Sequence, residues 1–272
     1  MAHTLSDVIA AVDRLWPLSG AEAWDASGLV SGDPSAPVAR IHVCVDAVSE
    51  TVGEALELGA DVLIAHHPLL LRGVTSVAED RYKGALLARL IRGDCALIAA
   101  HTNADVVVDG VSDVLAQRLG LADVRPLVPT VSDAVGIGRV GVLPRPLTLG
   151  ALARVLAEVL PPTATGVRVA GEYSREVRTV TLCGGAGDSY LGETAVRESD
   201  VYITSDLRHH PASEAREQAL LGAGPALIDV SHWASEWLWL ETAAAQLRGA
   251  LDGIEVTVSE LRTDPWDFAV PQ

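Results

Sequence analysis

The chain has only three cysteines among its 272 residues, and no two of them form a Cys-x-x-Cys pair. Cys44, Cys95 and Cys183 each lie within an apolar, strand-like run. This pattern argues against a structural zinc site built from thiolates and against a disulfide framework. We therefore expect three buried thiols in a protein of a reducing compartment.

Long apolar runs and an excess of basic residues are also missing. No stretch approaches the roughly 18 uninterrupted apolar residues of a membrane-spanning helix, and no basic region precedes a long apolar stretch at the N-terminus. The 20 basic residues stand against 36 acidic ones, which gives a net charge of -16. This charge works against non-specific binding to nucleic acid or anionic membranes. We expect a cytoplasmic protein that binds neither nucleic acid nor membrane directly.

The usual nucleotide-binding motifs are absent as well. There is no Gly-x-x-x-x-Gly-Lys-Ser/Thr loop, and Gly185-Ala186-Gly187 fails the dinucleotide fingerprint because Tyr190 stands where the third glycine is required. These glycines are instead expected to form a tight turn from a strand to a helix.

The sequence alternates between strand-like and helix-like segments, which predicts an α/β fold with mixed or mostly parallel sheets. Strands are predicted at 41–45, 62–65, 95–100, 136–143, 167–170, 177–183, 201–204, 226–230 and 254–259. Helices are predicted at 4–16, 49–58, 82–92, 111–119, 148–160, 189–198 and 231–247, with another after residue 211. The domains are predicted as a first α/β half (1–125), a short middle excursion without chemistry (126–176) and a second α/β half (177–272).

The second half repeats the first. Laying residues 41–64 over 180–203 without a gap, an offset of 139, superposes Cys44 on Cys183 and Asp61 on Asp200. Both copies then reach a His-His-Pro, at 66–68 and at 209–211. We expect two related βαβ-type halves that face a shared site, and the alternative is a chance similarity between two such units.

The clearest candidate site residues are His66 and His67, which follow the apolar run 61–65 and precede Pro68. Adjacent residues on a strand point to opposite faces, so both imidazoles reach one place only if the strand has ended before them. Two imidazoles that diverge from one point suit two neighbouring metal ions. The alternative is a pair of ordinary polar loop histidines.

Two more polar clusters follow predicted strands. The segment 101–105, His-Thr-Asn-Ala-Asp, comes after strand 95–100, and His232 opens a helix after strand 226–230. His232 and Glu236 are four residues apart, so both project from one helix face and suit joint coordination of an ion. Open α/β sheets place their sites at the carboxyl ends of strands, so we expect the clusters to converge.

The convergent set contains imidazole and carboxylate groups without thiolate. Such ligands suit zinc, manganese, iron, cobalt or nickel. Five further polar residues lie on neighbouring loops: His101, Asn103, Asp206, His209 and His210. Their candidate roles are to orient ligands, to shuttle protons or to bind substrate. The alternative is that they only form hydrogen bonds with the loop backbone.

At this point the chain resembles the dinuclear-metal proteins known as GTP cyclohydrolase I type 2 homologues, or NGG-interacting-factor-3-like proteins. The matching motifs are Trp24-Asp25-x-x-Gly28-Leu29, Ala65-His66-His67-Pro68-Leu69, Ala100-His101-Thr102-Asn103-x-Asp105, Gly184-Gly185-Ala186-Gly187, Thr204-x-Asp206-x-x-His209-His210 and Asp229-x-x-His232-x-x-x-Glu236. One departure is Ala26, where the family usually has Asn.

The resemblance implies a specific ligand set. It makes His66 and Asp105 ligands of one divalent ion, His67 and His232 ligands of the other, and Glu236 the bridge between them. It also implies a toroidal hexamer whose sites face an internal cavity. Many relatives carry a larger inserted domain where this chain has only its short middle segment.

Two ions held in this way would activate water and clamp carbonyl or phosphoryl oxygens, which predicts hydrolysis. The first hypothesis is a metal-dependent hydrolase acting on a nucleotide, pterin or phosphoester. The second is a non-enzymatic metal-binding scaffold that hands metal ions or a metallocofactor to a partner. The third is an interaction module without functional metal.

Overall fold

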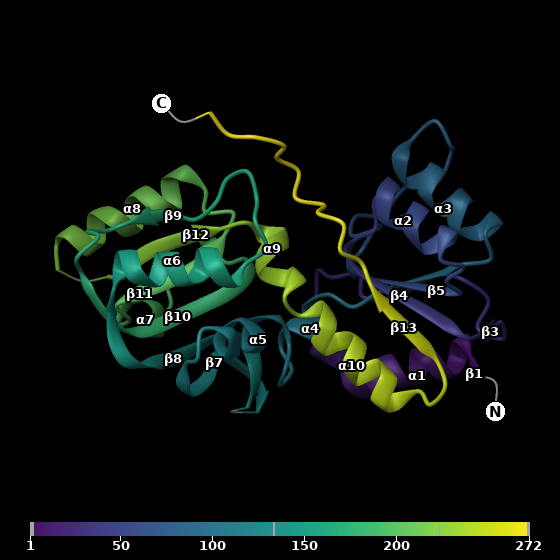
Figure 1. Ribbon diagram of the computed structural model, residues 1–272, viewed down its shortest axis with the longest axis horizontal. Coiled ribbons are helices and arrows are strands. Elements are labelled where there is room, and N and C mark those ends of the chain that lie inside the picture. Colours follow the sequence, from purple (N-terminus) through teal and green to yellow (C-terminus); the bar gives the residue numbers. More distant parts are fainter. Residues whose placement is uncertain (1–2, 133, 223, 271–272) are drawn as a thin grey trace. The chain divides into compact units, whose positions relative to one another are not determined.

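The computed structural model describes residues 3–132, 134–222 and 224–270. It confirms a mixed α/β fold with parallel and antiparallel strands, divided into two compact units (Figure 1). The first unit holds Met1–Ala104 and Leu240–Thr263, and the second holds Asp105–Trp239 and Asp264–Gln272. The predicted limits at residues 125 and 176 do not coincide with these, since the first unit ends at Ala104 and takes up the chain again at Leu240–Thr263.

A five-stranded sheet forms the centre of the first unit, in the order β13-β4-β5-β6-β2. Its strands are β2 (Gly28–Ser31), β4 (Arg40–Asp46), β5 (Val62–His67), β6 (Ala96–Ala99) and β13 (Glu255–Val258). All neighbours are parallel except β2, which runs antiparallel to β6. The central strands are nearly continuous apolar runs because helices cover both faces of the sheet. A separate two-stranded sheet pairs β1 (His3–Thr4) with β3 (Pro37–Val38).

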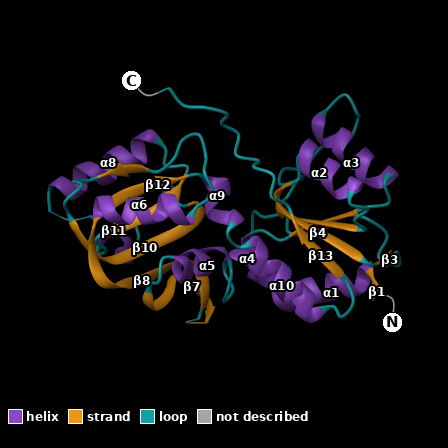
Figure 2. Cartoon of the chain, in the orientation of Figure 1, coloured by secondary structure: helices purple, strands orange, loops and turns teal. Residues whose placement is uncertain are grey.

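Helices of the first unit lie in pairs on the two faces of this sheet (Figures 1 and 2). One pair is α2 (Ser49–Glu57) and α3 (Tyr82–Arg92); the other is α1 (Leu5–Leu15) and α10 (Leu240–Ala250). The start of α1 is fixed because Thr4 and Asp7 form a capping box. A short helical turn, η1 (Leu18–Gly20), follows α1. Strand β13 is tied to β4 by a side-chain contact, in which His42 Nδ1 and Thr257 Oγ1 lie 2.8 Å apart.

The second unit contains a six-stranded sheet in the order β7-β8-β10-β11-β12-β9. Its strands are β7 (Ala122–Ser132), β8 (Val135–Thr148), β9 (Arg168–Ala170), β10 (Glu176–Ala186), β11 (Val201–Ser205) and β12 (Ala226–Val230). Strands β10, β11 and β12 are parallel, and the other three join antiparallel. The middle excursion is therefore built into this sheet through β8 and β9. The helical segments are α4 (Thr102–Asp105), which spans the limit between the units, α5 (Val111–Arg118), α6 (Leu149–Val159), η2 (Asp188–Tyr190), α7 (Thr194–Arg197), α8 (His209–Leu220) and α9 (His232–Trp237).

Two predicted helices differ from the structure, and β7 is one of the strands that the sequence does not predict. The helix at 231–247 is two helices, α9 and α10, because the chain passes from one unit to the other at Trp239. The helix at 189–198 is reduced to η2 and α7, with the poor helix former Gly192 between them. Strand β7 is not predicted from the sequence because it contains Pro126 and Pro129, and proline is tolerated only in an edge strand such as this one.

The internal repeat is visible in the strand pairing. Ile41 pairs with Val62 in the first unit, and Val180 pairs with Val201 in the second, so the register follows the offset of 139. Two aspartates at the same offset also make equivalent hydrogen bonds. Asp61 accepts the backbone N–H groups of residues 39 and 40 at 2.7 and 2.8 Å, and Asp200 accepts those of residues 178 and 179 at 2.9 and 2.7 Å. A chance similarity does not explain this agreement.

Across the described ranges, none of the helices has the length and apolar character needed to span a membrane.

Candidate metal centre

His66 and His67 lie inside a strand, which corrects the prediction that the strand ends before them. Strand β5 continues to His67 because this residue pairs with Asp46 of β4. Its pairing with β6 has already stopped at Ala65, so the last two residues are held on one side only. The two imidazole rings still come together, with centroids 5.1 Å apart.

One nitrogen of each of these imidazoles is fixed by the surrounding protein. His66 is 1% exposed, and its Nδ1 donates to the carbonyl oxygen of Ala100 at 2.8 Å. His67 Nδ1 donates to Asp46 Oδ1 at 2.7 Å, and the Thr263 hydroxyl donates to the other oxygen of Asp46. With Nδ1 protonated, Nε2 carries the lone pair through which each ring could bind a metal ion.

His101 belongs to the same cluster in the first unit. Its ring centroid lies 5.3 Å from that of His66 and 5.5 Å from that of His67. One ring nitrogen from each of the three histidines can be chosen so that the three nitrogens all lie within 4.8 Å of one another. This cluster could hold a metal ion with neutral imidazole ligands.

The position of His101 is set by a buried aspartate. Asp25 Oδ1 accepts from His101 Nδ1 at 2.7 Å, and Asp25 Oδ2 accepts from the Thr102 backbone N–H at 3.0 Å. Burial raises the pKa of Asp25, but the hydrogen bonds from His101 and Thr102 outweigh it and hold this pKa below its ordinary value. Asn103, which is fully buried, accepts from the His101 backbone N–H at 2.9 Å and donates to the Trp16 carbonyl at 2.7 Å. Both polar groups of the Asn103 side chain are therefore engaged in holding the loop.

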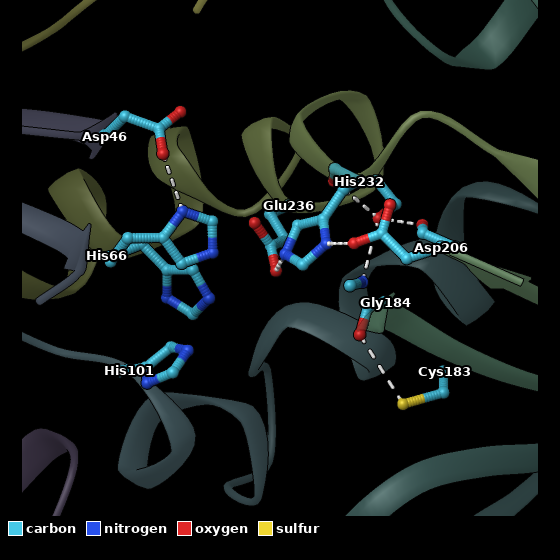
Figure 3. A network of polar contacts seen from close by, with 12 residues as sticks. Asp46, His66, His101, Cys183, Gly184, Asp206, His232 and Glu236 are labelled. Atoms are coloured by element: carbon cyan, nitrogen blue, oxygen red, sulfur yellow. Dashed lines mark hydrogen bonds and ion pairs between the residues drawn. The ribbon is translucent and has the colours of Figure 1, made fainter. Parts of the chain in front are cut away.

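In the second unit, His232 lies between two carboxylates (Figure 3). Its Nδ1 is 2.6 Å from Asp206 Oδ2, and its Nε2 is 2.9 Å from Glu236 Oε1. Burial lowers the pKa of His232, but the charge of Glu236 and the hydrogen bond to Asp206 outweigh it and raise this pKa well above its ordinary value. The spacing of four residues on α9 thus brings His232 and Glu236 together as predicted, and Asp206 orients the ring.

Gly185 makes room for the His232–Glu236 pair. It has φ +68°, and a Cβ atom on it would lie 2.4 Å from Glu236 Oε1 and 3.3 Å from His232 Nε2. The prediction of a strand-to-helix turn is wrong for this glycine, because β10 continues to Ala186 through an irregular register. Only glycine fits at this point of the strand, because any side chain would occupy the space of the Glu236 and His232 side chains.

Asp105 lies at the end of α4, in the second unit, and is partly buried. Burial and the charges of Asp105 and Glu236 raise the pKa of the Cys183 thiol to about 12. Both carboxylates are therefore close enough to Cys183 to act on its thiol electrostatically. Cys183 itself is a buried neutral thiol, as are Cys44 and Cys95.

The second His-His pair lies away from this position. The offset of 139 places Ser205 and Asp206, and not His209 and His210, at the positions of His66 and His67. His209 and His210 begin the exposed helix α8, with ring centroids 5.3 Å apart. The sequence match at His-His-Pro is thus not a structural equivalence.

Two orienting residues, Asp46 and Asp25, are not assigned this role by the sequence. Asp46 directly follows the predicted strand 41–45, so the rule that sites lie at strand ends could have found it. Asp25 stands in the Trp24-Asp25 loop, whose sequence indicates only packing or the lining of a pocket. Both contact their histidine from a distant part of the sequence, 21 and 76 residues away.

Within each unit, the structure therefore brings imidazole and carboxylate groups together in an arrangement suited to metal binding. In each of the four histidines a carbonyl or carboxylate oxygen fixes Nδ1, a feature that protein metal ligands commonly share. The donor set fits a divalent transition metal and leaves out the soft thiolate ligands.

Known proteins similar to this chain share one family. Residues 3–265 match the family model of Duf34/NIF3 (NGG1p interacting factor 3). The GTP cyclohydrolase 1 type 2 homolog of Streptomyces coelicolor is 51% identical over 269 residues, covering 96% of this chain and 93% of the relative. The GTP cyclohydrolase 1 type 2 homolog of Mycobacterium leprae is 33% identical over 377 residues, and the match covers 98% of this chain and 96% of the relative.

Among solved structures, a Bacillus cereus protein related to NIF3 has the same fold. Its TM-score is 0.91 at 23% identity, and the match covers 99% of this chain and 100% of that one. The chain therefore belongs to the Duf34/NIF3 family.

Proposed function

We propose that the chain binds two divalent metal ions and is a metal-dependent hydrolase of a nucleotide, pterin or phosphoester. The proposed ligands of the two ions are His66, His67, Asp105, His232 and Glu236. The hexamer implied by the family resemblance is part of this proposal. The name of the relatives refers to GTP as a substrate. The proposed substrates also include pterins and phosphoesters, because the chain lacks the usual nucleotide-binding loops.

The observation that carries the proposal is the fixed orientation of the three proposed histidine ligands. His66, His67 and His232 each have Nδ1 within 2.8 Å of an oxygen of the protein. Holding a ring in one tautomer lowers the entropy that is lost when its Nε2 binds a metal. The space left by Gly185 beside Glu236 and His232 supports the same reading.

Metal ions bound here supply Lewis acidity towards an oxygen of the substrate. The protein groups do the rest: Asp46 and Asp206 orient two ligands, and Asp25 holds His101 close to His66 and His67. His101 is the candidate for moving a proton, because its ring lies against the ligand rings and its Nδ1 is already tied to Asp25.

Elemental analysis of the purified protein tests the metal part of the proposal. We expect about two ions per chain, a loss of metal in His67→Ala, and an unchanged content in His3→Ala, a histidine that contacts only the Asp252 carbonyl in its described hydrogen bonds. A wild-type protein without metal after loading would refute the proposal.

Activity is tested on the metal-loaded protein against panels of nucleotides, pterins and phosphoesters. We expect turnover of one class and its loss in Glu236→Gln. If a protein verified to hold two ions turns over none of them, and a second protein co-purifies and accepts its metal, the alternative of a metal-delivery scaffold replaces the hydrolase.

A further inference from the structure

A hollow of about 430 Å³ lies in the second unit, between β9, β12 and α8. Its volume is within the range of sites for small organic ligands, which begins at about 300 Å³. Its lining is part apolar and part charged. The lining residues used below are Arg168, Leu207, His209, Arg216, Leu227 and Asp229.

The charged part of this lining is basic. Arg168 and Arg216 both line the hollow, together with His209, and the one acidic residue among them is Asp229. The Asp229 carboxylate is already engaged, because it accepts from Arg168 Nη2 and, at 3.1 Å, from the Leu207 backbone N–H. Asp229 therefore holds one arginine in place and does not present a free negative charge to a ligand. Such a concentration of guanidinium groups stands out in a chain with a net charge of -16.

Both arginines can donate to a ligand. The Arg168 side chain is 67% exposed although its Nη2 is paired with Asp229, so this side chain remains accessible to a ligand. Arg216 is also exposed. Guanidinium groups recognise phosphate through paired, charge-assisted hydrogen bonds. The partly buried Leu207 and the buried Leu227 offer an apolar wall for the body of the same ligand.

The hollow and the proposed metal ligands of the same unit draw on adjacent residues of the chain. Leu207, which lines it, follows Asp206 in the chain, and Asp206 Oδ2 lies 2.6 Å from Nδ1 of His232. The segment that lines the hollow is therefore continuous in the chain with the residue that orients His232.

We propose that this hollow binds the phosphate group of an organic phosphate of nucleotide size, with Arg168, Arg216 and His209 as the phosphate-binding residues. As a statement about the substrate, this assignment rests on the proposed function. It narrows the three substrate classes to those that carry a phosphate group.

Equilibrium dialysis with GMP and with guanosine tests the assignment on the full-length, metal-loaded protein. We expect saturable binding of GMP and at least tenfold weaker binding of guanosine, which lacks the phosphate. Arg168→Ala and Arg216→Ala should each weaken GMP binding about tenfold, since each removes a charge-assisted contact, and should leave guanosine binding unchanged. Arg154→Ala, an arginine that lies over the Tyr173 ring in the same unit, is the matched control and should bind GMP like the wild type.

Three outcomes would overturn the assignment: no saturable GMP binding, equal binding of GMP and guanosine, or wild-type GMP affinity in both arginine variants. Arg216 has no described ion pair with Asp229, so Arg216→Ala keeps the test valid if Arg168→Ala perturbs the fold. Metal content, measured on the same samples, separates the two proposals. If the protein holds two ions but does not bind GMP, only the assignment of the hollow is overturned. If GMP binding depends on the arginines but the protein holds no metal, the proposed hydrolase is overturned and the hollow remains a phosphate-binding site.

Discussion

At the scale of single residues, the candidate centre depends as much on the groups that hold the ligands as on the ligands themselves. The candidate ligands could be selected from the sequence because His66, His67 and His232 stand next to predicted strands or helices. The orienting groups Asp46 and Asp25 could not be assigned to their histidines, because no local pattern connects contacts that close over long stretches of sequence. The prediction for Gly185 fails for the same reason, since its neighbours Glu236 and His232 come from another part of the chain.

Gly185→Ala should lose metal from the His232–Glu236 pair. The added methyl group would lie 2.4 Å from Glu236 Oε1, so the carboxylate must move. We expect metal affinity to fall by about 10- to 100-fold, as for other changes that displace the surroundings of a ligand. The affinity is measured by competition with a chelator.

Gly166→Ala is the control for this experiment. Gly166 also has a positive φ, of +58°, but a Cβ atom on it would meet no atom within 4 Å. Both variants carry the backbone strain of about 1–2 kcal/mol, and only the first disturbs the pair. Equal metal affinity in the two variants would contradict the role given to Gly185.

Asp25→Asn should destabilise the protein at neutral pH and flatten the dependence of its stability on acid. The folded-state pKa of Asp25 is below the ordinary value of 3.8. The ionised carboxylate therefore adds stability at pH values above 3.8, and this stability is lost as the pH falls from 3.8 towards the folded-state pKa. We expect a loss of about 2 kcal/mol at pH 7, in line with hydrogen bonds to a charged group, and a smaller difference from wild type as the pH drops below 3.8. Urea unfolding between pH 3 and about 7 measures both. The exposed Asp33→Asn should show little change, and an equal effect in the two variants would count against the buried network.

At the scale of elements, the strands of the two repeated halves were predictable and the contacts that join the middle segment were not. Apolar runs and the offset of 139 identify β4, β5, β10 and β11. The sequence suggests that the middle segment is separate from the two halves. In the structure, antiparallel pairing of β8 with β10 joins it to the sheet, and no local pattern in the sequence indicates this pairing. The break between α9 and α10 has no breaker residue at Trp239, so only the passage between units explains it.

Arg139→Ala should strongly destabilise the second unit, because this one side chain of β8 joins several elements. The residue is 1% exposed; its guanidinium donates to Asp113 of α5 at 2.8 Å and to the carbonyl oxygens of Val107, Gly136 and Gly138. Removing it leaves a partly buried carboxylate without its ion-pair partner, and we expect a loss of about 3–5 kcal/mol. Thermal unfolding measures the loss. Arg145→Ala, at an exposed position of the same strand, should unfold like the wild type, and a similar result for Arg139→Ala would refute the prediction.

At the scale of the whole molecule, the sequence predicts the fold class and the repeat but places the domain limits elsewhere. Hydrophobic patterns show which segments form strands, whereas the return of α10 and β13 to the first unit depends on pairing between β13 and β4. Two strands more than 200 residues apart in sequence leave no local signal of such pairing.

The proposed hexamer should depend on ionic strength. Each chain carries a net charge of -16, so six chains repel one another and salt screens this repulsion. Light scattering after gel filtration should give six times 28.5 kDa at moderate salt, with partial dissociation at low salt and low protein concentration. A monomeric mass under all conditions would refute the assembly.

The contact between Thr263 and Asp46 has a consequence for how the protein is made. Asp46 orients His67, and β13 and Thr263 complete its surroundings only from the last part of the chain. During synthesis the edge of β4 stays open until residues 255–258 leave the ribosome, after nearly all of the second unit has emerged. An open strand edge is prone to wrong pairing, so the nascent first unit is exposed to aggregation for most of translation. The contact that fixes the second oxygen of Asp46 therefore forms only near the end of synthesis, and under the proposed function His67 should bind metal in its final setting only when the chain is almost complete.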